Sequence, residues 1–271
     1  MRCEKIDIKN KDSMDYAALY IYLLDHSSDI AIQERPMIII CPGGGYSFTS
    51  DREAEMIAMQ FLAFGYHAAV LRYSVAPARY PTALLEVGKS VSILREHAIE
   101  WHIHPDQIVV TGFSAGGHLA ASFCMFWSED WVAKRLGAAS ENLRPNAMIL
   151  GYPVITSGEY AHRDSFECLL GEEYEEKQEK LSLENYVNEN TPRSFIWHTF
   201  EDGGVPVQNS ILLAEALVKC HIPTELHIFE KGGHGLALAN RLTQSYGAST
   251  IQPAAAQWIE MAHKWMEGWI L

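Results

Sequence analysis

The chain has 271 residues, of which 48% are hydrophobic, so it contains enough apolar material for a substantial core. Its 21 lysine and arginine residues against 34 acidic residues give a formal net charge of -13, which argues against nucleic acid and anionic membranes as partners. The five cysteines are scattered without a Cys-x-x-Cys spacing, and their odd number argues against a disulfide framework.

The N-terminal residues, MRCEKIDIKNKDSMD, are polar and charged where a secretory signal would need an apolar run. No later apolar stretch approaches the length of a membrane-spanning helix. The sequence therefore predicts a soluble, cytoplasmic protein whose thiols are reduced and mostly buried. The next segment, Ala17–Leu24, is apolar and is predicted to be a strand of an antiparallel edge hairpin that leads into a parallel core.

A regular alternation begins at Met37, where short apolar runs start to alternate with longer amphipathic segments. This pattern is typical of a mostly parallel central sheet with helices on both faces. The strands expected in this sheet are Met37–Cys41, Tyr66–Leu71, Gln107–Thr111, Asn146–Leu150, Phe195–Thr199 and Thr224–Phe229. Because the sequence has no internal repeat and no linker-like stretch, residues 1–271 are predicted to form a single α/β domain.

A run of three glycines, residues 43–45, follows the first expected core strand. A loop at the carboxyl end of such a strand lies at the edge of the sheet where ligands bind. Successive glycines let backbone N–H groups approach a substrate oxygen closely, as the donors of an oxyanion hole must. Gly44 and Gly45 are therefore candidate oxyanion donors, together with the N–H of Ala115. A phosphate-binding loop is disfavoured because the run lacks a Gly-Lys-Ser/Thr ending.

Two helices are predicted from the spacing of apolar residues. In the segment after Pro81 the apolar residues recur at intervals of three or four, so a helix would place them on one face. These residues are Leu84, Val87, Val91, Leu94 and Ala98. The last helix is expected to begin after Gln252 with Pro253 in its first turn, where a missing N–H costs nothing. Trp258, Met261 and Trp265 would lie on one side of it.

Residues 112–116, Gly-Phe-Ser-Ala-Gly, match the pattern Gly-x-Ser-x-Gly between an apolar run and a helical pattern, His118–Phe126. The two glycines have a physical reason in this context. A serine on a tight, strained turn requires small residues two positions before and after it, because side chains there would collide with each other and with the adjacent strand. The N-terminus of the following helix favours negative charge on a substrate oxygen. Ser114 is therefore the candidate nucleophile.

The segment from about residue 157 to 190 departs from the alternation, since it holds ten acidic residues against three basic ones and no strand-like run. We interpret it as an insertion. One hypothesis makes it a small cap that packs over the pocket and narrows it. The other makes it an acidic, solvated loop unrelated to specificity. As a cap, its charge would discourage anionic substrates.

Two later loops supply the candidate base and acid. His234 lies among glycines after the last expected strand, and Asp202 lies in a glycine-containing turn after the strand before it. The order Ser114, Asp202, His234 is the chain order of the α/β-hydrolase triad. In such a triad the serine attacks an ester carbonyl, the histidine takes and returns the proton, and the aspartate orients the histidine.

Three other side chains compete for these roles. Glu201 is adjacent to Asp202 and is the rival acid, although Asp202 is expected to lie nearer the apex of the turn. His118 and His198 are close in sequence to the candidate residues, but one falls within a predicted helix and the other within a predicted strand. Both are therefore expected to be buried, hydrogen-bonded structural residues. No histidine and carboxylate set has a metal-ligand spacing such as H-E-x-x-H, so no metal site is predicted.

The motifs PGGGY, GFSAGG, EDGGVP and GGHG, together with LRYSVAPARYP at 71–81, resemble those of the acetyl-xylan-esterase-like carbohydrate esterases. These enzymes belong to the hormone-sensitive-lipase-like branch of the α/β-hydrolases, and the likeness runs from about residue 38 to 235. The resemblance implies the α/β-hydrolase fold, the triad named above and the hydrolysis of short acyl esters, often acetyl groups on sugars. Pro42 stands where the lipase-like branch usually has histidine, which favours the sugar-esterase side.

The sequence therefore predicts a serine carboxylesterase that removes short acyl groups, such as acetyl groups on sugars or xylooligosaccharides, through an acyl-enzyme on Ser114. The expected partner is a small-molecule ester, and no cofactor is expected. A serine peptidase or amidase of the same fold would use the same triad and stays open. A non-catalytic binding protein on this scaffold would be expected to lack part of the triad. Acyl length, leaving alcohol and oligomeric state, including a homo-oligomer, are not determined by the sequence.

Overall fold

The computed structural model describes residues 1–246 and 250–270 and contains one eight-stranded sheet. The strands are β1 (Arg2–Asp7), β2 (Ala18–Leu23), β3 (Arg35–Cys41), β4 (His67–Arg72), β5 (Ile103–Phe113), β6 (Ala147–Gly151), β7 (Arg193–Thr199) and β8 (Thr224–Phe229). Their order in the sheet is β1-β2-β4-β3-β5-β6-β7-β8. β2 is antiparallel to β1 and β4, and all other pairs are parallel. The fold is that of the α/β-hydrolases, as predicted.

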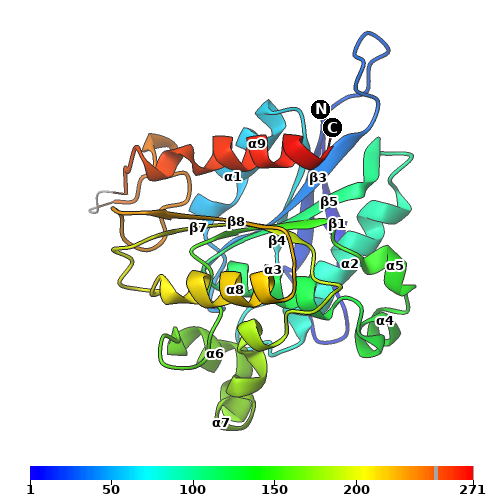
Figure 1. Ribbon diagram of the computed structural model, residues 1–271. Coiled ribbons are helices and arrows are strands. Elements are labelled where there is room, and N and C mark those ends of the chain that lie inside the picture. The colour runs from blue at the N-terminus through cyan, green and yellow to red at the C-terminus, as the bar shows by residue number, and fades with distance from the viewer. Residues whose placement is uncertain (247–249, 271) are drawn as a thin grey trace.

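Helices cover both faces of this sheet (Figure 1). They are α1 (Glu55–Ala63), α2 (Thr82–Glu96), α3 (Ala115–Phe126), α4 (Asp130–Leu136), α5 (Ser140–Leu143), α6 (Arg163–Leu170), α7 (Tyr174–Lys177), α8 (Gln208–Lys219) and α9 (Trp258–Ile270). α1 and α9 lie on one side of the sheet, and α2, α3 and α8 lie on the other. Within the described ranges, no helix combines the length and the apolar content needed to cross a membrane.

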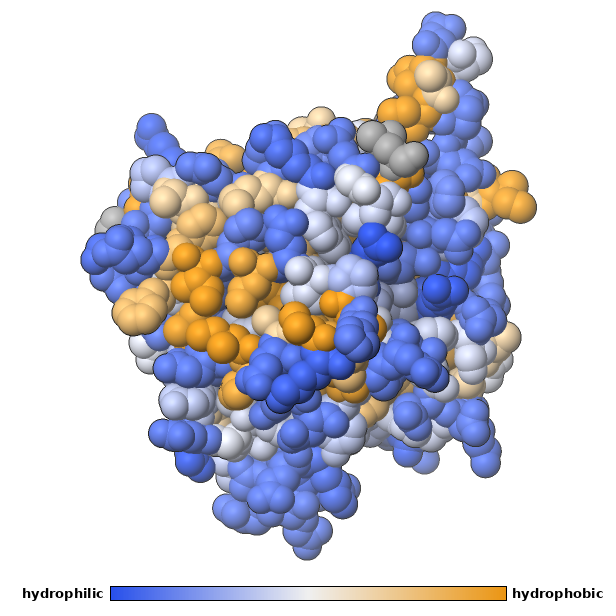
Figure 2. Space-filling view, viewed as in Figure 1, coloured by the Kyte–Doolittle hydropathy of each residue, from blue (hydrophilic) through white to orange (hydrophobic). Residues whose placement is uncertain are grey.

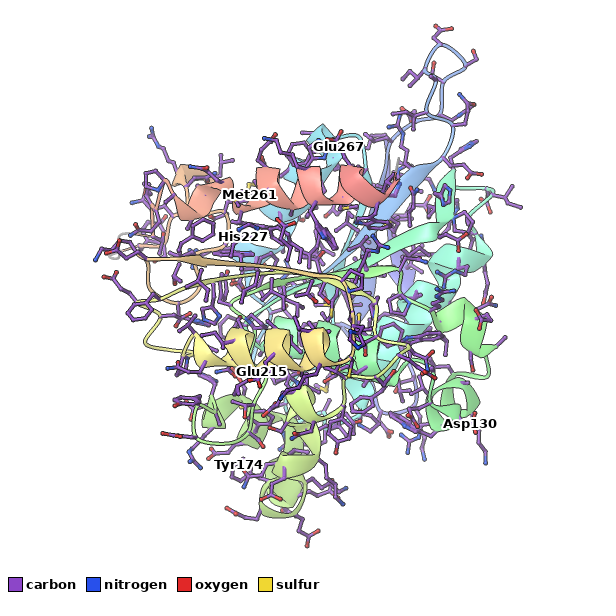
Figure 3. The ribbon with its side chains drawn as sticks, viewed as in Figure 1. Asp130, Tyr174, Glu215, His227, Met261 and Glu267 are labelled. Atoms are coloured by element: carbon purple, nitrogen blue, oxygen red, sulfur yellow. The ribbon has the colours of Figure 1, made fainter. Side chains whose placement is uncertain are left out.

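The core has two halves because the central strands bury side chains on both of their faces. In β3, Met37 and Ile39 pack into the half beneath α2, α3 and α8, whereas Ile38 and Ile40 pack into the half beneath α1 and α9. Alternate residues of a strand point to opposite faces, so a strand buried on both sides must be apolar throughout. Figure 3 shows the same three layers at the edge of the sheet, where Met261 of α9 and Glu215 of α8 lie on opposite sides of His227 in β8.

The predicted strands are all present, with shifted bounds. β5 begins four residues earlier than expected, at Ile103, because Ile103 pairs with Arg35 before a register shift in the β3–β5 ladder. The expected edge hairpin is formed by β1 and β2, and β2 also pairs with β4. The strand β1 was not predicted by periodicity, since its residues are mostly exposed and polar. An edge strand can be polar because little of it is buried.

The last helix is assigned a later start than the sequence predicts. Pro253 lies outside the helix, a short 3-10 turn covers Ala255–Gln257, and α9 begins at Trp258. The turn before α9 is nevertheless closed by a helical hydrogen bond, because the N–H of Ala256 donates to the carbonyl of Gln252 at 2.8 Å, while the N–H of Gln252 itself donates to Ala239. The helix predicted after Pro81 is α2, and its expected apolar stripe is buried.

The acidic segment 157–190 is helical and contains α6, α7 and three short 3-10 turns. It lies on the same side of the sheet as α3 and α8 (Figure 1). The part of it that projects farthest forms almost uniformly hydrophilic surface (Figure 2). Its acidic residues are mostly exposed, as a segment of this charge requires, while Phe166, Leu169, Leu170 and Leu181 anchor it to the core.

The cysteines differ in part from the expectation that they are mostly buried. All five are free thiols, and Cys41 and Cys124 are buried. Cys168 is half-buried, and Cys3 and Cys220 are exposed. Cys3 is exposed because it lies in the polar edge strand, and Cys220 because it caps the end of α8.

Candidate active site

Ser114 lies between the end of β5 and the start of α3, in the turn that the Gly-x-Ser-x-Gly pattern predicts. Its backbone is strained, with φ at 54° and ψ at -123°. A Cβ on Gly112 would lie 2.1 Å from the carbonyl oxygen of Gly116, and a Cβ on Gly116 would lie 2.2 Å from the carbonyl oxygen of Cys41 in β3. Only glycine therefore fits at both positions, for the steric reason expected from the sequence.

Three side chains from three loops form a hydrogen-bonded line. Ser114 Oγ lies 2.7 Å from Nε2 of His234, and Nδ1 of His234 lies 2.7 Å from Oδ2 of Asp202. Asp202 follows β7 and His234 follows β8, so both loops leave the carboxyl edge of the sheet on which β5 also ends. The arrangement allows His234 to accept a proton from the serine while Asp202 accepts the Nδ1–H of the same ring.

The surroundings of Asp202 keep it ionised. Burial raises the pKa of this carboxyl, but hydrogen bonds from His198 and His234 outweigh that effect and hold the pKa well below its usual range. The N–H groups of Gly204 and Val205 also donate to Oδ1, each at 2.9 Å. The carboxylate is therefore negative and fixed in orientation at neutral pH.

Glu201, the rival acid, points away from His234. Its side chain is exposed and accepts hydrogen bonds from Lys231 Nζ at 2.7 Å and from the N–H of Gly232 at 3.3 Å. These interactions lower the pKa of Glu201, the hydrogen bond from Lys231 most of all. Neighbouring residues of this turn thus face opposite directions, and the structure brings only Asp202 to the histidine.

The two competing histidines are buried and hydrogen-bonded. His118 Nδ1 lies 2.9 Å from the hydroxyl of Tyr46, and its Nε2 lies 3.0 Å from the carbonyl of Leu181. Burial lowers the pKa of His118 to about 4, so the ring is neutral at pH 7. His198 Nε2 lies 2.9 Å from the carbonyl of Val205 and 3.3 Å from Oδ2 of Asp202. His198 therefore supports the carboxylate, a contact that its position within a strand did not predict.

The glycine loop 43–45 lies beside Ser114. Gly44 has a φ of 132° and its Cβ would lie 2.2 Å from the carbonyl oxygen of Phe48, so this turn requires glycine. Within the described part of the chain, the N–H groups of Gly44, Gly45 and Ala115 have no hydrogen-bond acceptor. Gly44 and Gly45 line the same pocket as Ser114, and Ala115 starts α3 directly after it. These three donors can converge on an oxygen at the reacting centre.

A buried carboxylate, Glu53, completes the site and was not found from the sequence. Its Oε2 accepts the N–H of Gly43 at 2.8 Å and its Oε1 accepts the hydroxyl of Tyr152 at 2.6 Å. The same hydroxyl accepts the N–H of Ala237, and the Tyr152 ring packs edge-on to that of His234 at 5.1 Å between centroids. Glu53 thus ties the glycine loop to the loop of the base. No local motif marks such a residue, because its partners lie far away in sequence.

The site opens into a pocket of about 600 Å³. One wall comes from the acidic segment and includes His162, Asp164, Glu167 and Cys168, which lie in or next to α6. The lining also includes the glycine loop and Arg52, whose Nε donates to the carbonyl of Thr243 at 2.7 Å. The wall contributed by α6 was not expected at the level of individual residues. It is consistent with the cap hypothesis, which remains a hypothesis.

The described ranges contain no group of three or more histidine, cysteine, aspartate or glutamate side chains arranged to hold a metal ion. Ser114, His234 and Asp202 are hydrogen-bonded to one another as given above. The arrangement therefore offers a nucleophile, a base, an orienting acid and backbone donors, which together can transfer an acyl group.

The chain is similar to one protein family and to two proteins named as a xylanase and an acetylxylan esterase. The family model BD-FAE matches residues 21–217. Endo-1,4-beta-xylanase B of Butyrivibrio fibrisolvens is 37% identical over a match that covers 82% of this chain and 35% of that protein. Acetylxylan esterase of Xylanibacter ruminicola is 30% identical over 73% of this chain and 40% of that protein. The chain thus spans less than half the length of these two relatives.

Solved structures match along nearly the whole chain. A carboxylesterase from Lactobacillus plantarum has a TM-score of 0.85 at 30% identity, and the match covers 99% of this chain and 98% of that one. An acetyl ester-xyloside bifunctional hydrolase from Caldicellulosiruptor lactoaceticus has a TM-score of 0.82 at 34% identity, covering 98% and 96%. The fold described here is therefore shared with ester hydrolases over its full extent.

Proposed function

The chain belongs to the BD-FAE family of α/β-hydrolases, and from this premise we propose that it is a serine carboxylesterase that removes short acyl groups, above all acetyl groups, from esterified sugars. The proposal is supported above all by the hydrogen-bonded line from Ser114 through His234 to Asp202, with both distances at 2.7 Å. Beside it lies the glycine loop, where the N–H groups of Gly44 and Gly45 have no acceptor among the described residues. The names of the relatives, an acetylxylan esterase and a xylanase, support the sugar ester as substrate.

In the proposed reaction, Ser114 Oγ attacks the ester carbonyl carbon while its proton passes to Nε2 of His234. The N–H groups of the glycine loop and of Ala115 stabilise the negative oxygen of the tetrahedral intermediate. The carbon–oxygen bond to the alcohol then breaks, and His234 returns the proton to the leaving alkoxide. Water attacks the resulting acyl-serine by the same steps and releases the carboxylic acid and the free serine. Asp202 stabilises the imidazolium that forms in each half.

The charge of the α6 wall favours a neutral, hydroxyl-rich leaving group. Asp164 and Glu167 line the pocket and can accept hydrogen bonds from sugar hydroxyls, whereas an anionic alcohol would meet repulsion. This preference follows the cap hypothesis for the segment 157–190. It makes no demand on the length of the sugar chain.

One substrate panel tests the proposal. Hydrolysis is measured for acetyl, butyryl and long-chain nitrophenyl esters, acetylated xylooligosaccharides and an aminoacyl anilide. We expect the highest kcat/KM on acetyl esters, including the xylooligosaccharides, and no cleavage of the anilide. Ser114→Ala should lower turnover on esters by at least roughly 10⁴-fold, because it removes the hydroxyl that is hydrogen-bonded to His234.

Ser122→Ala is the matched control, since this serine is buried in α3 away from the pocket and its variant should keep full activity. Activity that survives Ser114→Ala would overturn the assignment of the nucleophile. Cleavage of the anilide in preference to every ester would overturn the proposed esterase activity and indicate a peptidase or amidase instead.

A further inference from the structure

A second pocket of about 450 Å³ lies where the acidic segment packs against the body of the protein. It is bordered by residues just before α2, at the end of α3, in α4, at the ends of α6 and α7, and in the stretch 178–186 that follows α7. Its lining includes four aromatic residues, Tyr80, Phe126, Trp131 and Tyr186, and three basic ones. In Figure 3, Asp130 marks α4 and Tyr174 marks α7, both on the α8 side of the sheet.

This pocket is separate from the one that contains Ser114. The two share no lining residue. α6 contributes to both, with Asp164, Glu167 and Cys168 lining the catalytic pocket and Leu170, at the end of the helix, lining the second one. A ligand of the second pocket would therefore not occupy the proposed site of ester hydrolysis.

Aromatic rings form much of the wall. The rings of Phe126 and Tyr186 meet edge to face at 5.1 Å between centroids, and those of Tyr80 and Trp131 lie 6.5 Å apart with their planes tilted by 58°. These four aromatic side chains are half-buried and present both ring faces and ring edges to the cavity. An aromatic ligand could therefore stack on them or pack edge to face against them. Burial raises the pKa of the Tyr80 hydroxyl to about 12, so this hydroxyl remains a neutral donor.

The charged residues that line this pocket are basic, although the protein as a whole has a negative net charge. The segment 157–190 holds ten acidic and three basic residues, yet two of the basic ones, Lys177 and Lys180, line the pocket and none of the acidic ones does. Arg135 adds a third cation from α4. Lys177 is paired with Glu173, whereas Arg135 and Lys180 have no ionic partner within residues 1–246 and 250–270. Two of the three cations in the lining thus make no ion pair within 4.0 Å among the described residues, and they lie beside an aromatic cavity.

We propose that this second pocket binds a small aromatic monocarboxylate. The ring would pack among Tyr80, Phe126, Trp131 and Tyr186, and the carboxylate would meet the cations. Arginine suits this role because its planar fork matches a carboxylate with two parallel hydrogen bonds. A neutral ligand would form no ionic interaction with Arg135 and Lys180. An anion without an apolar group would leave the aromatic rings exposed to water. The lining therefore favours a ligand that has both an aromatic ring and a carboxylate.

Calorimetric titration of the full chain with cinnamate tests the proposal, with cinnamyl alcohol as the neutral analogue and octanoate as the aliphatic anion. We expect cinnamate to bind, and to bind more tightly than either analogue. The double variant Arg135→Gln/Lys180→Gln should weaken cinnamate binding by about tenfold or more, because it removes both unpaired cations. The matched control is Lys219→Gln/Lys264→Gln, two exposed lysines on α8 and α9, which should bind cinnamate as the wild type does.

Equal binding of cinnamyl alcohol would overturn the role of the cations, and equal binding of octanoate would overturn the role of the rings. Binding that is unchanged in Arg135→Gln/Lys180→Gln would place the carboxylate elsewhere, including the catalytic pocket, and would also overturn the proposal. Trp131→Ala provides an independent test of the aromatic wall and should weaken cinnamate more than octanoate. Unchanged thermal midpoints would show that the variants are folded, so that a loss of binding reports on the pocket.

Discussion

At the scale of single residues, two adjacent carboxylates in one turn have opposite environments. Asp202 is buried and accepts from His234, whereas Glu201 is exposed and pairs with Lys231. We expect Asp202→Asn to lower kcat by roughly 10³–10⁴-fold, because an amide can stabilise neither the imidazolium nor the required tautomer. Steady-state hydrolysis of a nitrophenyl acetate measures the effect.

Glu201→Gln is the matched control for this prediction and should leave kcat within about a factor of two. An unfolding midpoint close to that of the wild type in both variants would exclude a folding defect. If Glu201→Gln proved to be the slower enzyme, the two carboxylates would exchange roles.

A second prediction at the scale of single residues concerns Glu53. Its carboxylate accepts from Gly43 and Tyr152 at once, whereas a glutamine has a single acceptor oxygen and would leave one of these donors unpaired. Glu53→Gln should therefore let the oxyanion loop shift and lower kcat by roughly 10- to 100-fold, with KM changed by less than about threefold. Binding of a boronic acid that mimics the tetrahedral intermediate should weaken in the same proportion.

The control for Glu53 is Glu55→Gln, since Glu55 lies two residues away and starts α1. Its carboxylate accepts a hydrogen bond from the hydroxyl of Tyr22 and, among the described residues, from no group of the active site. It should keep the wild-type kcat. A Glu53→Gln variant with normal kcat and normal boronate affinity would show that the buried carboxylate serves stability and not the oxyanion loop.

At the scale of elements, the turn between β5 and α3 packs closely against the end of β3. A Cβ on Gly116 would lie 2.2 and 2.3 Å from the carbonyl oxygens of Cys41 and Pro42, and backbone atoms cannot move aside cheaply. Gly116→Ala should therefore lower the free energy of unfolding by at least about 2 kcal/mol and reduce activity, because either the helix or β3 must shift. Urea unfolding followed by circular dichroism measures the change.

Gly268→Ala is the comparison for Gly116→Ala. Gly268 lies in α9 with open space around its Cβ position, and alanine is the better helix former by up to about 1 kcal/mol. This variant should be as stable as the wild type or slightly more so. A mild effect of Gly116→Ala, similar to that of Gly268→Ala, would mean that the turn can relax.

At the scale of the whole molecule, stability should depend on pH through histidines that are buried as neutral rings. His67 accepts the N–H of Leu24 at 3.1 Å, and burial lowers its pKa to about 4. His118 has the same lowered value. Between about pH 6.5 and 4 these two histidines are protonated in the unfolded chain but remain neutral in the folded protein. The free energy of unfolding therefore falls as the pH falls through this window. Each ring should contribute at most roughly 3 kcal/mol to the loss.

The prediction is tested by urea unfolding at pH 7 and at pH 4.5 in the wild type and in His67→Gln. The variant should lose less free energy of unfolding on acidification, because one of the two rings is gone. The buried carboxyl of Glu86, whose pKa is raised by burial, acts in the opposite direction but is present in both proteins, so it cancels in the comparison. Identical losses in wild type and variant would contradict the assignment to His67.

The sequence by itself determined the elements and the turns that depend on local chemistry. Periodicity located the core strands and α2, because burial on one or both faces requires a regular apolar spacing. The spacing around Ser114 predicted the strained turn, and the order of three loops predicted which side chains meet at the edge of the sheet. Each of these inferences depends on residues that are neighbours in the chain or on a rule for parallel sheets.

Only the tertiary structure decided which side chains of the loops and of the acidic segment face the site. Asp202 and Glu201 are both acidic and differ in the direction in which their side chains point. A sequence pattern therefore cannot tell which of them contacts His234. Glu53, Asp164 and the second pocket have no local signal either, because hydrogen bonds and cavities join residues that are tens of positions apart. Packing fixes these partners, and packing is set by the whole chain at once.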